Sequence, residues 1–385
     1  MQKLLYATLA FTALTLFSFR AKAQDATLEA SLPLEILEAT TPAATAAVEE
    51  EEEKPAFTLS GSADAYFRIS PDDQAPASSF ANLPGFSLGM FNLIGAHEGK
   101  KAGFVGDLVF GPRGGDAVFA SGVPTIGGFA ANASTFVNQL YVYLQASDKV
   151  KLTLGNFNTF LGYEVISPTA NFNYSTSYMF SYGPFSHTGV KADVAVSDDL
   201  SLMLGVFNPT DLTEFNAPGS YSVGAQVGYK GVYLNFLYGD QDGEAGNGPL
   251  FQADITAGFD LTDKLYLGVN ATINTTDVGT ESDNPAFFGG AGYLQYAFSD
   301  DFALGFRGEY FGESQGGYGI IGAYDLTDLS ASIIDLTLSA NVKFGDLTLI
   351  PEIRLDAASQ DIFLDGDGKA TSSLASFVLA GVYAF

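Results

Sequence analysis

Throughout most of the chain, apolar and polar residues alternate with a period of two along segments of about ten residues. In Phe57–Ile69 the odd positions are apolar or small, and the even positions are polar and include Asp64 and Arg68. Phe302–Phe311 and Leu347–Asp356 repeat this pattern. Because successive side chains of a strand point to opposite faces, each segment predicts a β-strand with one apolar and one polar face.

The connections between these segments favour a membrane barrel over a soluble β-sandwich, whose strands would also alternate. Short turns, such as Ser197–Asp199, Ser299–Asp301 and Gly345–Asp346, alternate with long loops. The long loops fall near residues 70–85, 112–134, 158–186, 209–218, 240–249, 274–285, 313–332 and 357–372. The sequence therefore predicts an all-β, antiparallel, up-and-down transmembrane β-barrel of about sixteen strands. Its short turns would be periplasmic, its long loops extracellular and its lumen aqueous.

The N-terminus has the three parts of a secretory signal peptide. Lys3 precedes the apolar stretch Leu4–Phe19, and Ala21 and Ala23 supply a small-residue cleavage site. We expect residues 1–23 to be removed after Ala23 and the mature chain to reach the cell outer membrane. An uncleaved membrane helix is the alternative, but the apolar stretch is shorter than the roughly 20 residues of a typical membrane span.

Residues 24–55 form an acidic region before the first predicted strand. The run Glu49–Glu53 lies there among Ala, Thr and Pro residues. This composition predicts a flexible periplasmic arm, with the barrel at residues 56–385, and partner binding by the arm is the alternative. The net charge of −27 argues against nucleic acid as a partner. The absence of cysteine excludes disulfides and thiolate chemistry.

The last predicted strand, Ser373–Phe385, ends on an aromatic residue. Leu379, Tyr383 and Phe385 share its apolar face. A terminal aromatic residue on an alternating strand resembles the signal by which the barrel-insertion machinery of the outer membrane recognises its substrates. We therefore expect Phe385 to face outer-membrane lipid and to act as an assembly signal.

A distinctive motif occupies residues 154–194. A strand that ends in Gly-x-Phe is followed by an aromatic-rich stretch with polar residues at fixed places: Gly162, Glu164, Asn171, Asn173, Ser175, Pro184–Phe185 and Thr188–Val190. This motif resembles the OmpL-like family of β-barrel porins, which is widespread in Bacteroidetes-type bacteria. The likeness extends over about residues 57–385. It implies a channel architecture more firmly than it implies any particular solute.

Charged residues occupy the strand face opposite the apolar rows. In a barrel this face lines the lumen, so a mixed set is predicted to line the pore: Asp64, Arg68, Asp107, Lys151, Lys191, Asp193, Asp254, Arg307, Glu309, Asp335, Lys343, Glu352, Arg354 and Asp356. Acids outnumber bases in this set, which predicts a weak preference for cations. We expect small hydrophilic solutes and ions to be the partners of the lumen, without a cofactor or a bound metal.

The longest loop, Asn158–Ser186, is rich in Phe and Tyr. Exposing so many rings would be costly, because apolar burial is worth roughly 25 cal/mol per Å². The rings should pack against the barrel wall or against each other. This loop is predicted to fold inward as a constriction, with Glu164, Asn171 and Asn173 presenting polar groups to the solute path. An outward lid or a subunit contact, as in a homotrimer, would bury the rings equally well.

An enzymatic barrel is the competing class. The chain has two histidines, His97 and His187, which the strand order places at opposite ends of the barrel. Ser186 beside His187 leaves open a hydrolytic site that would also need a distant acid. Two acidic, glycine-containing stretches, Asp240–Glu244 and Asp365–Gly368, allow a loop-stabilising Ca²⁺ site, although solvated loop acids are the simpler interpretation.

The sequence therefore predicts a porin-like channel for passive diffusion, and not an enzyme. A non-conducting barrel with a structural, adhesion or assembly role is the main alternative.

Overall fold

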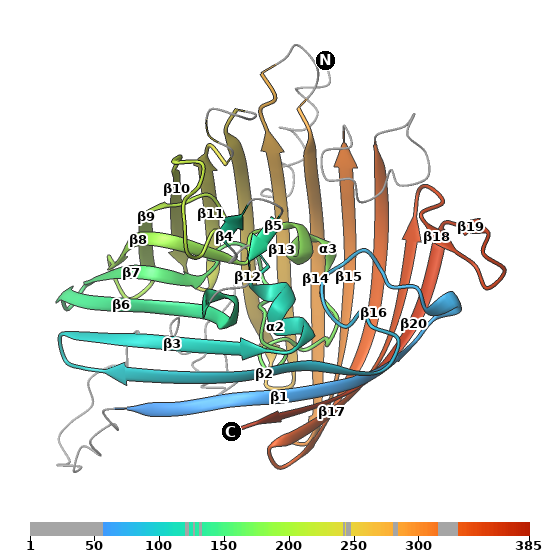
Figure 1. Cartoon of the computed structure of the whole chain (residues 1–385). Helices are drawn as coiled ribbons and strands as arrows, with labels where there is room; N and C mark the ends of the chain where they lie inside the picture. The colour runs from blue at the N-terminus through green and yellow to red at the C-terminus, as the bar shows by residue number, and fades with distance from the viewer. Residues whose placement is uncertain are drawn as a thin grey trace. The chain divides into compact units, whose positions relative to one another are not determined.

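The chain folds into a closed β-barrel. The computed structural model describes residues 57–119, 123–125, 128–130, 133–241, 243, 248–279, 284–314 and 330–385. Within these residues, sixteen antiparallel strands close into a ring in which neighbours in sequence are neighbours in space (Figure 1). The predicted strand number and up-and-down topology are confirmed. The expected signal peptide (1–23) and acidic arm (24–55) lie outside the described residues.

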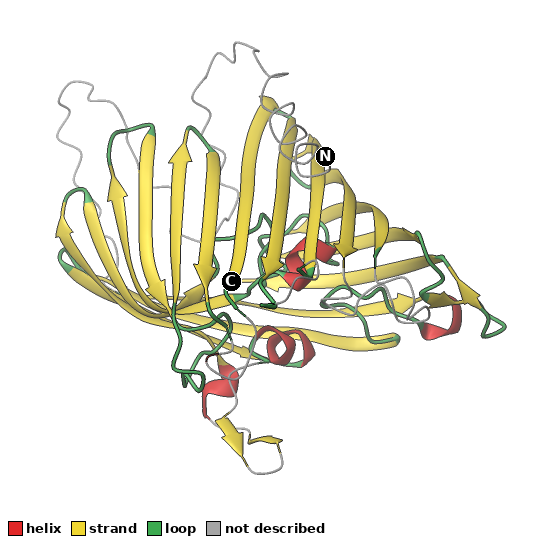
Figure 2. Ribbon diagram, turned by 90° about the horizontal axis from the view of Figure 1, so that it is seen from above, coloured by secondary structure: helices red, strands yellow, loops and turns green. Residues whose placement is uncertain are grey.

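Figure 2 shows the same strands from above as a continuous curved wall. The barrel strands are β1 (Thr58–Ile69), β2 (Gly85–Glu98), β3 (Ala102–Phe110), β6 (Val137–Ser147), β7 (Val150–Asn158), β8 (Ser186–Ala195), β9 (Leu200–Phe207), β10 (Ser222–Tyr229), β11 (Val232–Gly239), β12 (Leu250–Thr262), β13 (Leu265–Thr276), β14 (Ala286–Ser299), β15 (Phe302–Ser314), β16 (Ala331–Phe344), β17 (Leu347–Ala358) and β20 (Ser373–Ala384).

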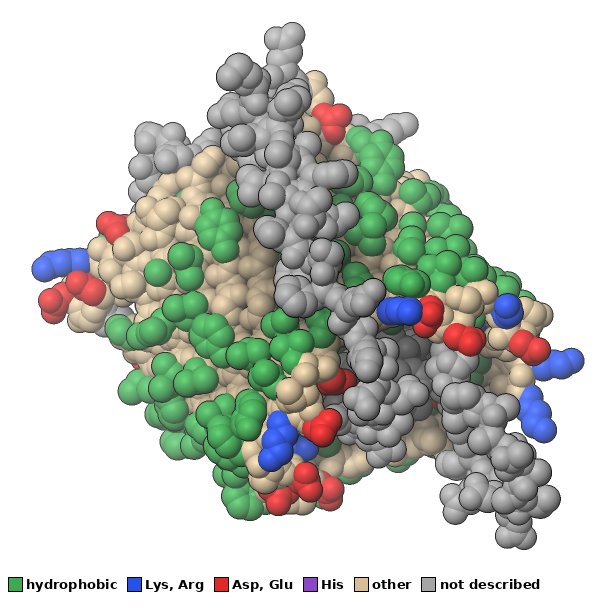
Figure 3. Space-filling view, turned by 180° about the vertical axis from the view of Figure 1, so that it is seen from behind, with side chains coloured by type: hydrophobic (Ala, Val, Ile, Leu, Met, Phe, Trp, Pro, Cys, Tyr) green, Lys and Arg blue, Asp and Glu red, His purple; other side chains and the backbone are tan. Residues whose placement is uncertain are grey.

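The outer face of the wall is apolar and the inner face is polar, the reverse of a soluble protein. On β16, Ile334, Leu336 and Leu338 are exposed, whereas the intervening Asp335 and Thr337 are fully buried. Figure 3 shows hydrophobic side chains over one outer face, with most of the charged side chains towards its edges. Such a surface is stable only in contact with lipid or another apolar surface.

The connections alternate in length as the sequence predicts. Gly345 and Asp346 join β16 to β17, and Gly345 adopts a φ of +63°, which costs glycine little. The long connections carry the short elements η1 (Pro71–Asp73), α2 (Pro112–Ala117), β4 (Val123–Thr125), β5 (Gly128–Ala130), η2 (Ala133–Phe136), α3 (Tyr178–Tyr182), β18 (Phe363–Leu364) and β19 (Ala370–Thr371). Among the described residues, none of the helices is both long and apolar enough to cross a membrane.

The chain terminus completes the ring. β20 pairs with β1 over eight residues of each strand, from Ser62 opposite Ala384 to Ile69 opposite Phe377. Beyond β20, the backbone of Phe385 exchanges two hydrogen bonds with Gly61, at 2.9 and 3.0 Å. The Phe385 side chain is exposed on the outer face, as expected for a lipid-facing terminal residue.

Candidate functional site inside the barrel

A lattice of charged residues covers the inner face of β15, β16 and β17. Directly paired residues form two adjacent rows across the three strands, an acidic row of Glu309, Asp335 and Asp356 and a basic row of Arg307, Thr337 and Arg354. The rows follow from the period of two, because all six positions alternate with outward apolar residues. All six side chains are buried.

Ion pairs link the two rows. Arg307 Nη2 lies 2.8 Å from Asp335 Oδ2, and Arg354 Nη2 lies 2.8 Å from Asp356 Oδ1 and 3.2 Å from the same Asp335 oxygen. Burying a charge is costly unless a partner and hydrogen bonds replace its water. Asp335 therefore serves as the shared counter-ion of both guanidinium groups.

The segment 159–185, which connects β7 to β8, supplies further ligands of the arginines. Glu164 Oε1 lies 2.7 Å from Arg307 Nη1, which also donates to the Ser175 carbonyl at 2.7 Å. Arg354 Nη1 donates to the Thr176 carbonyl at 2.8 Å. Each arginine thus joins the barrel wall to the same segment.

Two wall carboxylates bind backbone N–H groups of this segment instead of arginines. Glu309 accepts hydrogen bonds from Tyr178 N and Met179 N, at 2.8 and 2.7 Å, at the start of α3. Glu352 accepts from the N–H groups of Tyr174 and Ser175, at 2.7 and 3.1 Å. These bonds satisfy donors that the irregular backbone would otherwise bury unpaired.

Aromatic side chains of the segment extend the contact around the ring. Tyr174 donates to Asp64 on β1 and Tyr178 donates to Asp356 on β17, at 2.5 and 2.8 Å. The Phe172 ring fills the space where Gly305 of β15 lacks a side chain, since a Cβ there would overlap it. The expected packing of the loop aromatics against the wall is therefore present.

In both directions around the ring from these three strands, an acid is held by amides. Asp254 on β12 accepts from Asn235 and Asn270 of the adjoining strands, at 2.8 and 2.6 Å, and from Gly162 N at 3.0 Å. Asp107 on β3 accepts from Asn92, Asn138 and Gln139 in the same manner. These amides were missed because they carry no charge. The same period of two would have placed Asn92, Asn235 and Asn270 inward, whereas Asn138 and Gln139 are adjacent and meet Asp107 at a register shift between β3 and β6.

The residues predicted to line the pore fall into three groups. Ten are buried beneath loops or neighbouring side chains: Asp64, Arg68, Asp107, Asp254, Arg307, Glu309, Asp335, Glu352, Arg354 and Asp356. Lys151 on β7 and Lys191 and Asp193 on β8 are half-buried, and the last two form a 3.6 Å ion pair. Lys343 is exposed beside the β16–β17 turn.

The polar residues expected to present groups to the solute path are already engaged. Glu164 is bound to Arg307, and Asn173 Nδ2 donates to Ser339 Oγ on the wall at 2.7 Å. The Asn171 side chain bonds both backbone groups of Val165, at 3.0 and 2.5 Å, and closes a turn within the segment. Contrary to the expectation, Glu164 and Asn173 anchor the segment to the wall and Asn171 shapes it.

Arg113 of α2 is a buried residue that the sequence argument did not single out. Its guanidinium lies between the rings of Phe80 and Tyr174, at 4.5 and 5.2 Å from their centroids. It donates to the carbonyls of Ile166 and Tyr174, at 2.9 and 3.3 Å. Because α2 lies in a long connection without periodicity, no pattern in the sequence marked this residue.

The histidines do not form a shared site. His187 is fully buried between Phe160 and Phe207, and its ring centroid lies 5.0 Å from the centroid of each of these rings. Its Nε2 lies 2.9 Å from Thr159 Oγ1. His97 stacks on Phe104 at 6.1 Å, its cross-strand neighbour on the outer face. The histidines therefore face opposite sides of the wall.

The two acidic stretches considered as Ca²⁺ sites have other structural explanations where the structure describes their residues. Asp365 Oδ1 accepts from Asp367 N and Lys369 N, both at 2.9 Å, and caps the β18–β19 turn. Asp242 and Glu244 of the other stretch lie outside the described residues. Within the described part of the chain, no group of three or more His, Cys, Asp or Glu side chains is arranged to hold a metal ion.

Comparisons with known proteins agree with the architecture. A family model described as "Putative beta-barrel porin-2, OmpL-like" matches residues 56–385. The fold resembles a loop-deletion mutant of OmpT, an outer membrane protein of Vibrio cholerae, with a TM-score of 0.53 and 12% identity over 86% of this chain and 99% of that one. Membrane-expressed OmpT itself gives 0.51 and 11% identity over 86% and 97%. No curated protein sequence matches.

Proposed function

This chain belongs to the OmpL-like β-barrel porin-2 family of the outer membrane, and on that premise we propose that it is a passive diffusion channel for small hydrophilic solutes and ions. In this proposal the segment 159–185 narrows the lumen. The channel carries out no catalysis, and binding is limited to transient contacts along the polar path.

One observation carries the constriction proposal, namely the reach of the segment around the inner wall. Gly162 N bonds Asp254 on β12, Met179 N bonds Glu309 on β15, and Tyr174 OH bonds Asp64 on β1. Contacts between a segment that leaves from β7 and inward residues on these strands support a course across the interior. An outward lid would leave these buried carboxylates without their donors.

Deleting Pro168–Tyr182 tests the constriction. If the segment narrows the pore, the deletion variant raises single-channel conductance in planar bilayers and admits larger sugars in liposome swelling. Heat-modifiable migration on a gel checks that the variant barrel has assembled. Unchanged conductance in an assembled variant would contradict the constriction.

A non-conducting barrel is the second candidate, favoured by the number of inward charges that neighbouring groups already bind. The wild-type protein distinguishes the two, since a structural barrel gives no conductance steps in a bilayer. Assembly into a homotrimer stays a prediction under either function.

A further inference from the structure

Between β10 and β15, in the half of the lumen next to the short turns, four aromatic rings pack over glycines of the inner wall. A Cβ added to any of these glycines would overlap the ring above it, and all four ring residues are half-buried. The pairs are Tyr233 over Gly228, Tyr266 over Gly258, Tyr163 over Gly268 and Phe172 over Gly305. Each ring therefore has one side against the backbone and keeps part of its surface open to the lumen. These four rings are here called the aromatic track.

The rings of the aromatic track follow one another across the strands. Tyr233 of β11 pairs with Thr256 of β12, two residues from the glycine under Tyr266. Tyr266 and Tyr163 share a hydrogen bond between their hydroxyl groups at 3.1 Å, and Tyr163 stacks on Tyr293 of β14 with 4.2 Å between ring centroids. Because Tyr233 and Tyr266 are each the second residue of a strand, the track lies next to the short turns.

The wall around the aromatic track is polar but uncharged. On β10 to β16, the inward residues level with the track are amides, hydroxyls, rings and small residues, among them Gln226, Thr256, Gln295 and Asn341. The inward charges Asp254, Arg307 and Asp335 lie farther from the short turns. Asp260 and Lys343 stand on the same rows but are exposed at the strand ends. A charged solute therefore finds no opposite charge on these strands at the level of the track.

Two of these amides have hydrogen-bonding groups to offer a solute. Gln295 pairs with Tyr266 on one side and with Gly305 on the other, which places it between the rings of Tyr266 and Phe172. Its half-buried side chain makes no hydrogen bond with any residue that the structure describes. Asn341 Nδ2 donates to the Phe172 carbonyl at 2.9 Å, and its Oδ1 has no partner in the described part of the chain. Amides carry both donors and an acceptor, which suits the hydroxyl groups of a solute.

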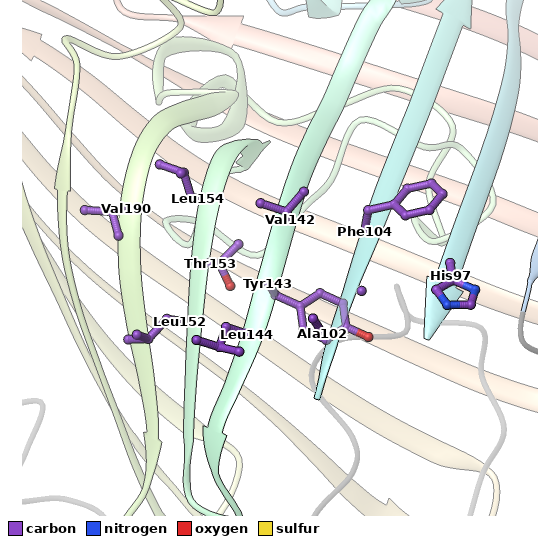
Figure 4. A pocket seen from close by; sticks show the side chains of 11 residues that line it. His97, Ala102, Phe104, Val142, Tyr143, Leu144, Leu152, Thr153, Leu154 and Val190 are labelled. Atoms are coloured by element: carbon purple, nitrogen blue, oxygen red, sulfur yellow. The ribbon is translucent and has the colours of Figure 1, made fainter. Parts of the chain in front are cut away.

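The rings on β6 and β7 have cations on their faces instead. Figure 4 shows Tyr143 of β6 among the residues that line a shallow hollow at β3 and β6 to β8. Tyr143 also lies over a glycine, Gly103 of β3, but Lys151 Nζ lies 5.6 Å from its ring centroid. Lys191 Nζ lies 5.0 Å from the ring centroid of Phe157 in the same manner. A ring face that holds a cation is not free for an uncharged solute, so these rings are not part of the track.

We propose that the aromatic track binds the ring of an uncharged carbohydrate. One face of a pyranose ring presents C–H groups, and these pack on the face of an aromatic ring, which carries partial negative charge. The hydroxyl groups at the edge of the sugar bond to amides such as Gln295 and Asn341. The assignment rests on the proposed channel function, since it names the class of solute that the same lumen passes.

Saturation-transfer NMR on the folded, detergent-purified protein provides the first test, because it reports sugar C–H groups in contact with the protein whether or not the pore conducts. The probe is maltotriose, a neutral chain of glucose rings, and the control solute is sorbitol, which carries its hydroxyl groups on an open chain. The detergent must have no sugar headgroup. Maltotriose should receive severalfold more saturation than sorbitol. Equal transfer to the two solutes would overturn the proposal.

Tyrosine variants locate the contact. Tyr233→Ala and Tyr266→Ala each remove a ring and should lower the transfer to maltotriose severalfold, whereas Tyr233→Phe keeps the ring and should retain the transfer. Tyr296→Ala is the matched control and should also retain it, because Tyr296 is an exposed tyrosine on the outer face. Heat-modifiable migration on a gel checks that each barrel has assembled. Transfer that survives both alanine changes would overturn the assignment to the track.

Conductance separates this proposal from the proposed function. In planar bilayers maltotriose should block the single-channel current of the wild type, and a severalfold higher concentration should be needed in Tyr233→Ala. A conducting channel that maltotriose neither blocks nor contacts would overturn the carbohydrate proposal and leave the diffusion channel standing. A barrel without conductance that still shows tyrosine-dependent transfer would refute the channel and support the track as a carbohydrate site.

Discussion

Arg307 and Glu164, 143 residues apart in sequence, form an ion pair of 2.7 Å in which the side chains are 0% and 3% exposed. Arg307 belongs to the barrel strand β15, and Glu164 belongs to the segment 159–185 between β7 and β8. The pair therefore joins the wall to the proposed constriction. Since Asp335 also binds Arg307, the wall keeps a counter-ion for the arginine if the segment leaves.

Replacing Glu164 by Gln should loosen the segment 159–185. Removing one partner of a buried ion pair typically lowers the stability by about 3–5 kcal/mol. Because Arg307 keeps its contact with Asp335, we expect this variant to lie at the lower end of that range. We expect higher single-channel conductance and faster proteolysis within the segment. Asp193→Asn, at a half-buried pair on β8, is the control and should change neither. Wild-type behaviour of Glu164→Gln would contradict the anchoring role.

The two wall carboxylates that bind backbone N–H groups give a second prediction. The sequence alone predicts that Glu309→Gln and Glu352→Gln weaken a cation preference. Because both carboxylates are buried and bound to the segment 159–185, we now expect a rise in conductance to dominate over any change in reversal potential. A shifted reversal potential at unchanged conductance would show that these acids face the solute path. A clear anion preference of the wild type would refute the predicted selectivity.

Glycine positions on the inner wall should be as sensitive as the charges. A Cβ at Gly305 would overlap the Phe172 ring, so Gly305→Ala should displace the segment and raise conductance. Overpacking of this kind typically costs about 1–3 kcal/mol. Gly292→Ala, on the outward row of the neighbouring strand β14, is the control for a glycine-to-alanine change in a strand, because its added Cβ meets no atom within 4 Å. Equal conductance of the two variants would exclude this packing role.

Deleting Phe385 should impair barrel assembly while leaving export to the periplasm intact. The residue contributes two backbone hydrogen bonds to Gly61 at the closure of the ring, and its ring lies on the lipid-facing surface. Phe385→Tyr preserves both features and should assemble normally. The amounts of heat-modifiable protein in outer-membrane fractions measure the effect, and wild-type amounts of the truncated chain would count against an assembly role.

Asp211, in the loop between β9 and β10, predicts a pH dependence. Burial raises its pKa to about 6, although the N–H groups of Ser186 and Phe185 act to lower it. The folded chain therefore binds this proton more tightly than the unfolded chain, where the carboxyl titrates near 3.8. The resulting stabilisation is complete below pH 3.8 and is lost as the pH rises through 6.

The temperature of the heat-modifiable gel shift, followed from pH 4 to pH 7, measures this contribution. Asp211→Asn keeps an acceptor for the two N–H groups and should flatten the decline in stability with rising pH. Asp361→Asn, at an exposed position, should retain the wild-type profile. A wild-type profile in Asp211→Asn would assign the pH dependence to other groups.

The sequence predicted which strand residues of the candidate site face inward, but not which groups these residues bind. The period of two placed Arg307, Glu309 and Glu352 on the inner face correctly, because facing depends only on local strand geometry. The same pattern could not show that loop atoms would cover them. Arg113 was missed because α2 has no periodicity, and the amides around Asp254 were missed because they carry no charge.

The sequence by itself determined the strand number, the ring order, and the inward and outward rows, including the outward position of Phe385. Each of these follows from alternation and from the lengths of connections, which are properties of neighbouring residues. Only the tertiary structure decided that Glu164 meets Arg307 and that Phe172 fills the space beside Gly305. These relationships join residues far apart in sequence, and they form because buried charges and rings need partners that only the closed barrel brings within reach.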